Sequence, residues 1–135
     1  MTPLAVSMGD PAGIGPEVIA KAWERRTTVP IPPFVVIGDG RAIEAVWPGP
    51  IARVSGVEDV ERAFADALPV LTVEAAGAIR PGVPDADGAR SALASLEAAV
   101  GLVRSGAARA LVTGPVSKAQ LYGAGFTHPG QTEFV

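Results

Sequence analysis

The chain has 135 residues, enough for one compact domain, and its 48% of hydrophobic residues excludes a disordered chain. Its 11 Lys and Arg against 14 Asp and Glu give a formal net charge of −3, which argues against nucleic acid or an anionic membrane as a partner. The absence of cysteine and the single histidine, His128, exclude disulfides, sulfur-based zinc sites and a histidine cluster within the chain.

The N-terminal residues lack the cationic and apolar regions of a secretory leader, and no apolar run is long enough to cross a bilayer. We therefore expect a cytoplasmic protein whose ligand is a small molecule. Four short apolar segments, each close to glycine or another turn residue, predict buried strands. They are residues 3–8, 34–38, 70–73 and 110–113.

Segments with helical spacing lie between and beside these strands, at residues 16–26, 41–46, 57–67 and 91–105. In the last, Leu93, Leu96, Val100 and Val103 are expected to form one apolar face, and Gly106 is expected to end the helix. Alternation of this kind predicts an α/β fold with a mostly parallel sheet and helices on both faces. Ligands of such folds bind beyond the carboxyl ends of the strands.

The turn at residues 9–17 joins the first strand to the first helix. Its glycines allow close approach of the backbone to a ligand, and Pro16 suits the first helical position. The helix start could hold an anion, although Asp10 and Glu17 would oppose a phosphate there. The alternative is a tight turn with no ligand. The spacing matches no standard phosphate motif, because Val18 stands where a third glycine would be needed.

A second turn of this kind spans residues 113–118. Lys118 would lie in the first turn of a helix, where the dipole disfavours a cation, so it needs water or an anionic partner. The order Ser117-Lys118 excludes the Walker A motif.

Two further polar positions have competing interpretations. Residues 128–134 place Gln131 and Thr132 after a turn, where they could bind a polyol or carboxylate, or where Thr132 could cap a helix. Asp39 follows the second strand and could bind a ribose, but we favour the N-cap of the helix that includes Arg41.

Five stretches carry a resemblance to a known family. They are SMGDPAGIGPE at 7–17, FVVIGD at 34–39, the turn and helix at 80–106, LVTGPVSKA at 111–119 and PGQTEF at 129–134. Together they resemble the 4-hydroxythreonine-4-phosphate dehydrogenase family of pyridoxal phosphate biosynthesis. The first and last motifs are the most specific, and the resemblance extends over the whole chain.

The resemblance implies a two-domain α/β enzyme of the isocitrate and isopropylmalate dehydrogenase type. Members are longer, so residues 1–135 would be the N-terminal part of the enzyme, with the remainder absent and the isolated part inactive. The implied reaction is oxidation and decarboxylation of 4-phosphohydroxy-L-threonine with NAD or NADP. A divalent metal (Zn, Mg or Co) would be bound by histidines outside this chain, and the enzyme would be a homodimer.

Carried over by position, the resemblance implies that Gln131 and Thr132 contact the substrate. Many members have histidine where Gln131 stands, and glutamine cannot shuttle a proton near neutral pH. Asp10 and Lys118 are expected to line the site, with Lys118 toward an anionic group. Two alternatives remain: a dehydrogenase of threonate or erythronate 4-phosphate, and a non-catalytic anion-binding module.

Overall fold

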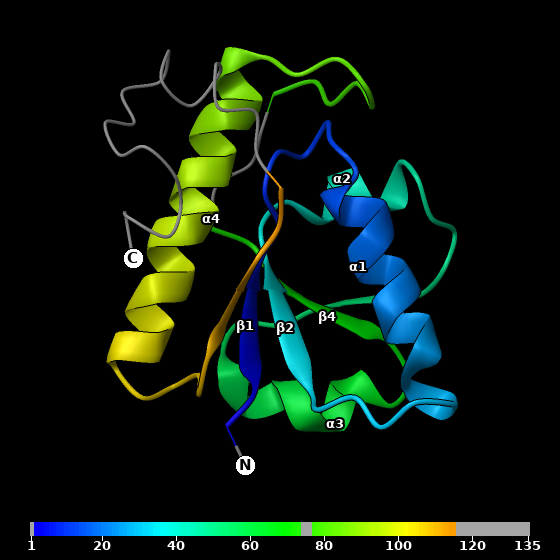
Figure 1. Cartoon of the computed structure of the whole chain (residues 1–135), viewed down its shortest axis with the longest axis vertical. Helices are drawn as coiled ribbons and strands as arrows, with labels where there is room; N and C mark the ends of the chain where they lie inside the picture. Colours follow the sequence, from blue (N-terminus) through cyan, green and yellow to red (C-terminus); the bar gives the residue numbers. More distant parts are fainter. Residues whose placement is uncertain (1, 74–76, 116–135) are drawn as a thin grey trace.

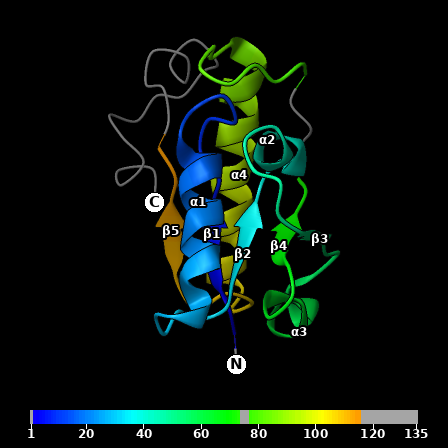
Figure 2. The same ribbon diagram turned by 90° about the vertical axis from the view of Figure 1, so that its right-hand side faces the viewer.

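A computed structural model describes residues 2–73 and 77–115 of the chain. Five parallel strands form one sheet in the order β3-β4-β2-β1-β5, with β5 at one edge and β3 at the other (Figure 2). The strands are β1 Leu4–Ser7, β2 Phe34–Ile37, β3 Ile51–Arg53, β4 Leu68–Leu71 and β5 Leu111–Thr113.

Helices cover both faces of the sheet, which confirms the predicted fold class. They are α1 Gly15–Glu24, α2 Gly40–Glu44, α3 Val60–Phe64 and α4 Ala86–Arg104, with short 3-10 turns at Arg25–Thr27 and Val57–Asp59. Figure 1 shows α1 and α4 on opposite sides of the strands. Within the described residues, no helix combines the length and the hydropathy needed to cross a membrane.

Side chains alternate between the two faces of each strand, as the pleat of a sheet requires. Val6 and Val36 pack in one buried cluster with Trp23 of α1. Ala5 and Val35 pack in a second cluster with Ala99 of α4. The central strands are therefore buried from both sides, and ligand-binding groups are expected at the strand ends.

The predicted apolar face of α4 is only partly correct. Leu96 is buried, but Leu93, Val100 and Val103 are half-buried, because small residues contact the sheet instead and bring the helix close to it. The buried residues of α4 are Leu96 and six small residues: Gly88, Ala89, Ser91, Ala92, Ser95 and Ala99. The helix also begins at Ala86 rather than at residue 91, because the Asp85 side chain accepts a hydrogen bond from the Gly88 amide at 2.8 Å and caps it.

Other elements also differ from the prediction: β4 spans Leu68–Leu71 rather than residues 70–73, and α2 and α3 are shorter than predicted. Strand β3 was not predicted, since it has three residues and is partly exposed, too short for an alternating pattern. Helix α1 begins at Gly15, so Pro16 is its second residue rather than its first. Gly106 ends α4 as predicted, with φ +83° and its amide donating to the Val103 carbonyl at 3.1 Å.

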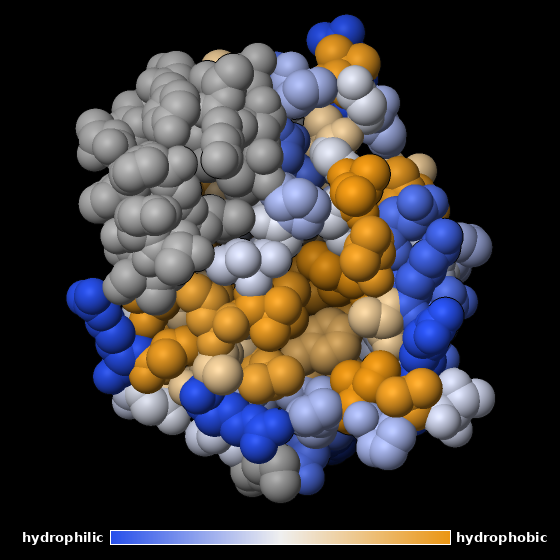
Figure 3. All heavy atoms as spheres, viewed as in Figure 1, coloured by the Kyte–Doolittle hydropathy of each residue, from blue (hydrophilic) through white to orange (hydrophobic). Residues whose placement is uncertain are grey.

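An apolar groove of about 290 Å³ lies between α1 and β5. Figure 3 shows apolar side chains gathered over this part of the molecule. Val18 of α1 is 53% exposed and Val112 of β5 is 47% exposed, and β5 is the edge of the sheet. This face therefore presents apolar surface that folding of the described residues leaves uncovered.

Candidate functional site

The order of the strands identifies one place where a ligand would bind. From β1 the chain passes to β2 on one side, and it returns to β5 on the other side of β1. Such a reversal of strand order leaves a crevice beyond the carboxyl ends of the two strands, and open α/β sheets bind their ligands there. The turns at residues 9–17 and 113–115 both lie at this switch point.

The two turns are bonded directly to each other. The Gly114 amide donates to the Ser7 carbonyl at 2.8 Å, and the Asp10 amide donates to the Pro115 carbonyl at 3.0 Å. A Cβ on Gly9 would lie 2.2 Å from the Pro115 oxygen. The close approach of the two backbones therefore explains Gly9 and Gly114.

A hollow of about 310 Å³ lies beside these turns, near the lower limit of roughly 300 Å³ for ligand sites. A loop from residues 80–85 closes one side of it, and the Gly82 amide donates to the Ala12 carbonyl at 2.7 Å. The residues that line the hollow are Asp10, Ala12, Gly13, Ile14, Gly82, Pro84 and Pro115. Sequence reasoning did not assign Gly82 or Pro84 to a site, although the Pro81-Gly82 pair indicated the turn.

Asp10 is the one charged residue in that lining, and it is 3% exposed. Its Oδ1 accepts a hydrogen bond from the Ala12 amide at 2.8 Å. Its Oδ2 is buried and has no hydrogen-bond partner among the described residues. A Cβ on Gly88 would lie 3.3 Å from Asp10 Oδ1, so the carboxylate also abuts the first turn of α4. The structure thus puts Asp10 in the wall of the hollow, and its contact with a ligand stays a prediction.

The anion site considered for the first turn has few free donors. The amides of Asp10, Ala12 and Gly13 all donate within the fold, to the Pro115 carbonyl, Asp10 Oδ1 and the Asp10 carbonyl. Pro11 and Pro16 have no amide hydrogen. These loop residues therefore offer no amide to a phosphate, and an anion site at the helix start itself stays a prediction.

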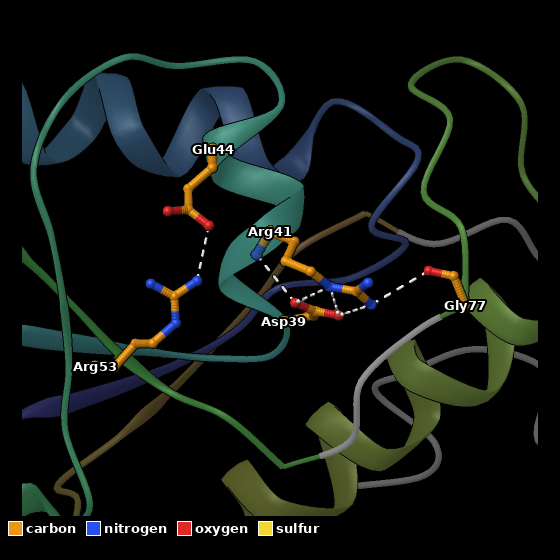
Figure 4. A network of polar contacts seen from close by, with 5 residues as sticks. All are labelled: Asp39, Arg41, Glu44, Arg53 and Gly77. Atoms are coloured by element: carbon orange, nitrogen blue, oxygen red, sulfur yellow. Dashed lines mark hydrogen bonds and ion pairs between the residues drawn. The ribbon is translucent and has the colours of Figure 1, made fainter.

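Asp39 is the N-cap of α2, as predicted. Its side chain accepts from the Arg41 amide at 3.0 Å and from the Arg41 guanidinium at 2.7 Å, as Figure 4 shows. The hydrogen bond and the charge of Asp39 raise the pKa of Arg41. Arg41 also donates to the Gly77 carbonyl at 3.2 Å, which attaches α2 to the segment before α4.

Four residues named from the sequence lie outside the described residues: Lys118, His128, Gln131 and Thr132. Their roles stay predictions. Within residues 2–73 and 77–115, no three His, Cys, Asp or Glu side chains group closely enough to hold a metal ion. The resemblance implies that the ligands of the divalent metal lie outside this chain, and that stays a prediction.

A family model for the pyridoxal phosphate biosynthetic protein PdxA matches residues 31–135. The chain belongs to this family. The 4-hydroxythreonine-4-phosphate dehydrogenase of Zymomonas mobilis is 51% identical over 135 residues, which are all of this chain and 40% of that protein. The chain therefore spans about two-fifths of the length of the relatives that it matches.

Solved structures agree with this assignment. A putative 4-hydroxythreonine-4-phosphate dehydrogenase from Salmonella typhimurium superimposes with a TM-score of 0.87 and 30% identity, over 98% of this chain and 43% of the other. A terephthalate 1,2-cis-dihydrodiol dehydrogenase from Burkholderia xenovorans gives a TM-score of 0.73 and 26% identity, over 96% of this chain and 38% of the other. The relatives are thus oxidoreductases, and their names include more than one substrate.

Proposed function

We propose that residues 1–135 are the N-terminal part of a two-domain dehydrogenase that oxidises and decarboxylates 4-phosphohydroxy-L-threonine in pyridoxal phosphate biosynthesis. The observation that carries the proposal is the 51% identity with a dehydrogenase of that name along all of this chain. The switch-point hollow supports it, because a ligand site is expected there in this fold.

In this proposal, NAD or NADP accepts the hydride from the secondary alcohol of the substrate, and a divalent metal (Zn, Mg or Co) is bound outside this chain. The residues of this chain bind and orient the substrate. Gln131 and Thr132 hydrogen-bond the substrate, and Lys118 attracts an anionic group of it. Gln131 provides no general acid or base, because an amide does not titrate near neutral pH.

The experiment that tests this proposal follows the products of the complete protein, the longer protein of which these residues would be the first part. For each 4-phosphohydroxy-L-threonine consumed, we expect one reduced nicotinamide, one CO₂ and one amino-hydroxyacetone phosphate. Reduction of the nicotinamide without CO₂ would contradict the decarboxylation step. No reduction at all would contradict the dehydrogenase itself.

Lys118→Ala in the complete protein is expected to raise the substrate KM or lower kcat at least ~10-fold, the effect of losing a charged hydrogen bond to an anion. Steady-state kinetics with 4-phosphohydroxy-L-threonine measure it. Lys21→Ala is the matched control, since Lys21 is the other lysine of the chain and is exposed on α1. Equal kinetics for the two variants would remove Lys118 from the site.

A second candidate is a dehydrogenase of a related substrate, such as threonate or erythronate 4-phosphate. The likeness to the terephthalate dihydrodiol dehydrogenase favours this candidate, because it shows that relatives with this fold differ in substrate. A non-catalytic anion-binding module is less favoured, since the amides of the first turn are used within the fold. We further propose that the complete protein is a cytoplasmic homodimer.

A further inference from the structure

Two buried side-chain atoms among the described residues have no hydrogen-bond partner, Asp10 Oδ2 and Ser7 Oγ. An unpartnered buried carboxylate oxygen is the more costly of the two, because a charged group loses far more solvation than a hydroxyl. Most buried polar atoms in folded proteins are paired, so Asp10 Oδ2 calls for a partner that the described residues do not supply.

The rest of Asp10 is held firmly. Its amide donates to the Pro115 carbonyl at 3.0 Å and its Oδ1 accepts from the Ala12 amide at 2.8 Å. The first turn of α4, around Gly88, packs against the carboxylate, and the positive end of that helix favours a negative charge there. Oδ2 is therefore the remaining acceptor of a carboxylate whose position is fixed.

The hollow of about 310 Å³ adjoins this side chain and has space for a ligand group next to it. Among the described residues, no lysine or arginine lines the hollow. The amides of Ala12, Gly13 and Gly82 donate within the fold, and the Asp10 charge repels anions. As far as the described residues decide it, the hollow next to Asp10 therefore favours a neutral or cationic group that donates a hydrogen bond.

We propose that Asp10 Oδ2 accepts a hydrogen bond from a hydroxyl or ammonium group of the ligand, and that the phosphate of the substrate binds elsewhere. Because Oδ2 is buried, this contact requires the wall of the hollow to move. This inference rests on the proposed function for the source of the donor. The source is either the amino and hydroxyl groups of the substrate or the ribose hydroxyls of the nicotinamide cofactor.

Asp10→Asn tests the proposal in the complete protein. Asparagine keeps an oxygen for the Ala12 amide and puts a donor where Oδ2 was, so two donors would face each other. Calorimetry with NAD⁺, NADP⁺ and 4-phosphohydroxy-L-threonine, each added alone, measures Kd without turnover. We expect Kd to rise at least ~10-fold for one of these ligands. A rise for the nucleotide alone assigns the donor to the ribose, and a rise for the substrate alone assigns it to the substrate.

Asp39→Asn is the matched control. Asp39 is 4% exposed at the same edge of the sheet and also accepts from the amide two residues on, but its carboxylate is paired with Arg41. We expect it to leave every Kd within about threefold of wild type, a change of about 0.65 kcal/mol in binding free energy.

A purely structural role for Asp10 would lower Tm and leave the affinities unchanged, whereas we expect Tm to fall by no more than ~3 °C. If Asp10→Asn does not fold, Asp10→Ser retains an acceptor for the Ala12 amide and removes Oδ2. Unchanged Kd values for all three ligands would overturn the proposal. A wild-type protein that binds these ligands without oxidising the substrate would overturn the dehydrogenase and leave the test of Asp10 valid.

Discussion

Gly9→Ala is expected to lower the free energy of unfolding by about 2–5 kcal/mol, a large part of the roughly 5–15 kcal/mol that holds a domain folded. Gly9 has φ +80°, and a Cβ there would lie 2.2 Å from the Pro115 oxygen and 2.8 Å from the Gly114 carbonyl carbon. Those atoms are backbone and cannot rotate away. The turns of β1 and β5 would have to separate, so we expect Tm to fall by ~10 °C or more.

Two other glycines separate the causes of this effect. Gly106 has φ +83° but nothing within 4 Å of its would-be Cβ, so alanine there should lower the free energy of unfolding by only about 1–2 kcal/mol. Gly101 lies within α4 with equally open space, so alanine should raise it by about 0.5–1 kcal/mol. In thermal unfolding followed by circular dichroism, Tm should fall in the order Gly101→Ala, wild type, Gly106→Ala and Gly9→Ala, from highest to lowest. Equal losses at positions 9 and 106 would mean that the two turns do not meet as described.

Residues 1–135 alone are expected to fold and yet to show no nicotinamide-dependent turnover. The reason is that the described residues offer no group of His, Cys, Asp and Glu for a metal, and that the chain spans about 40% of its Zymomonas relative. Assays with the proposed substrate, cofactor and each candidate metal would measure this, with the complete protein as the positive control. Far-ultraviolet circular dichroism would show that the inactive chain is folded.

The uncovered groove between α1 and β5 gives this expectation a second readout. Ile14 is 65% exposed and Val18 is 53% exposed beside an open sheet edge, so the isolated chain should self-associate more than the complete protein does. Sedimentation velocity would compare the two. Turnover by residues 1–135 alone, with a metal added, would refute the claim that essential ligands lie outside them.

The sequence predicted the parallel sheet because short apolar runs bounded by glycine and proline are a strong local signal. It also predicted the Asp39 cap, because a cap bonds an amide two or three residues away. The buried face of α4 was harder to predict from the sequence. The residues that pack on the sheet are small, such as Ala92 and Ala99, and small residues contribute little to a hydrophobic pattern. Strand β3 was missed because it has three residues, which are partly exposed and too few for an alternating pattern.

The candidate site, too, was predicted from the sequence only in part. Both glycine turns were found from the sequence, and their contact follows only from the strand order that places β5 beside β1. The unpartnered Oδ2 of Asp10 could not be predicted, since it depends on which amides the fold consumes. The roles of Lys118, Gln131 and Thr132 still rest on the family motifs.

The central claim is that these residues belong to a dehydrogenase specific for 4-phosphohydroxy-L-threonine, and one comparison of kcat/KM tests it most directly. The complete protein would be assayed with NAD⁺ or NADP⁺ and a divalent metal against 4-phosphohydroxy-L-threonine, threonate 4-phosphate, erythronate 4-phosphate and terephthalate dihydrodiol. We expect kcat/KM for 4-phosphohydroxy-L-threonine to exceed every other value at least ~100-fold, as loss of polar substrate contacts would produce. A higher kcat/KM for any of the other three would contradict the assignment.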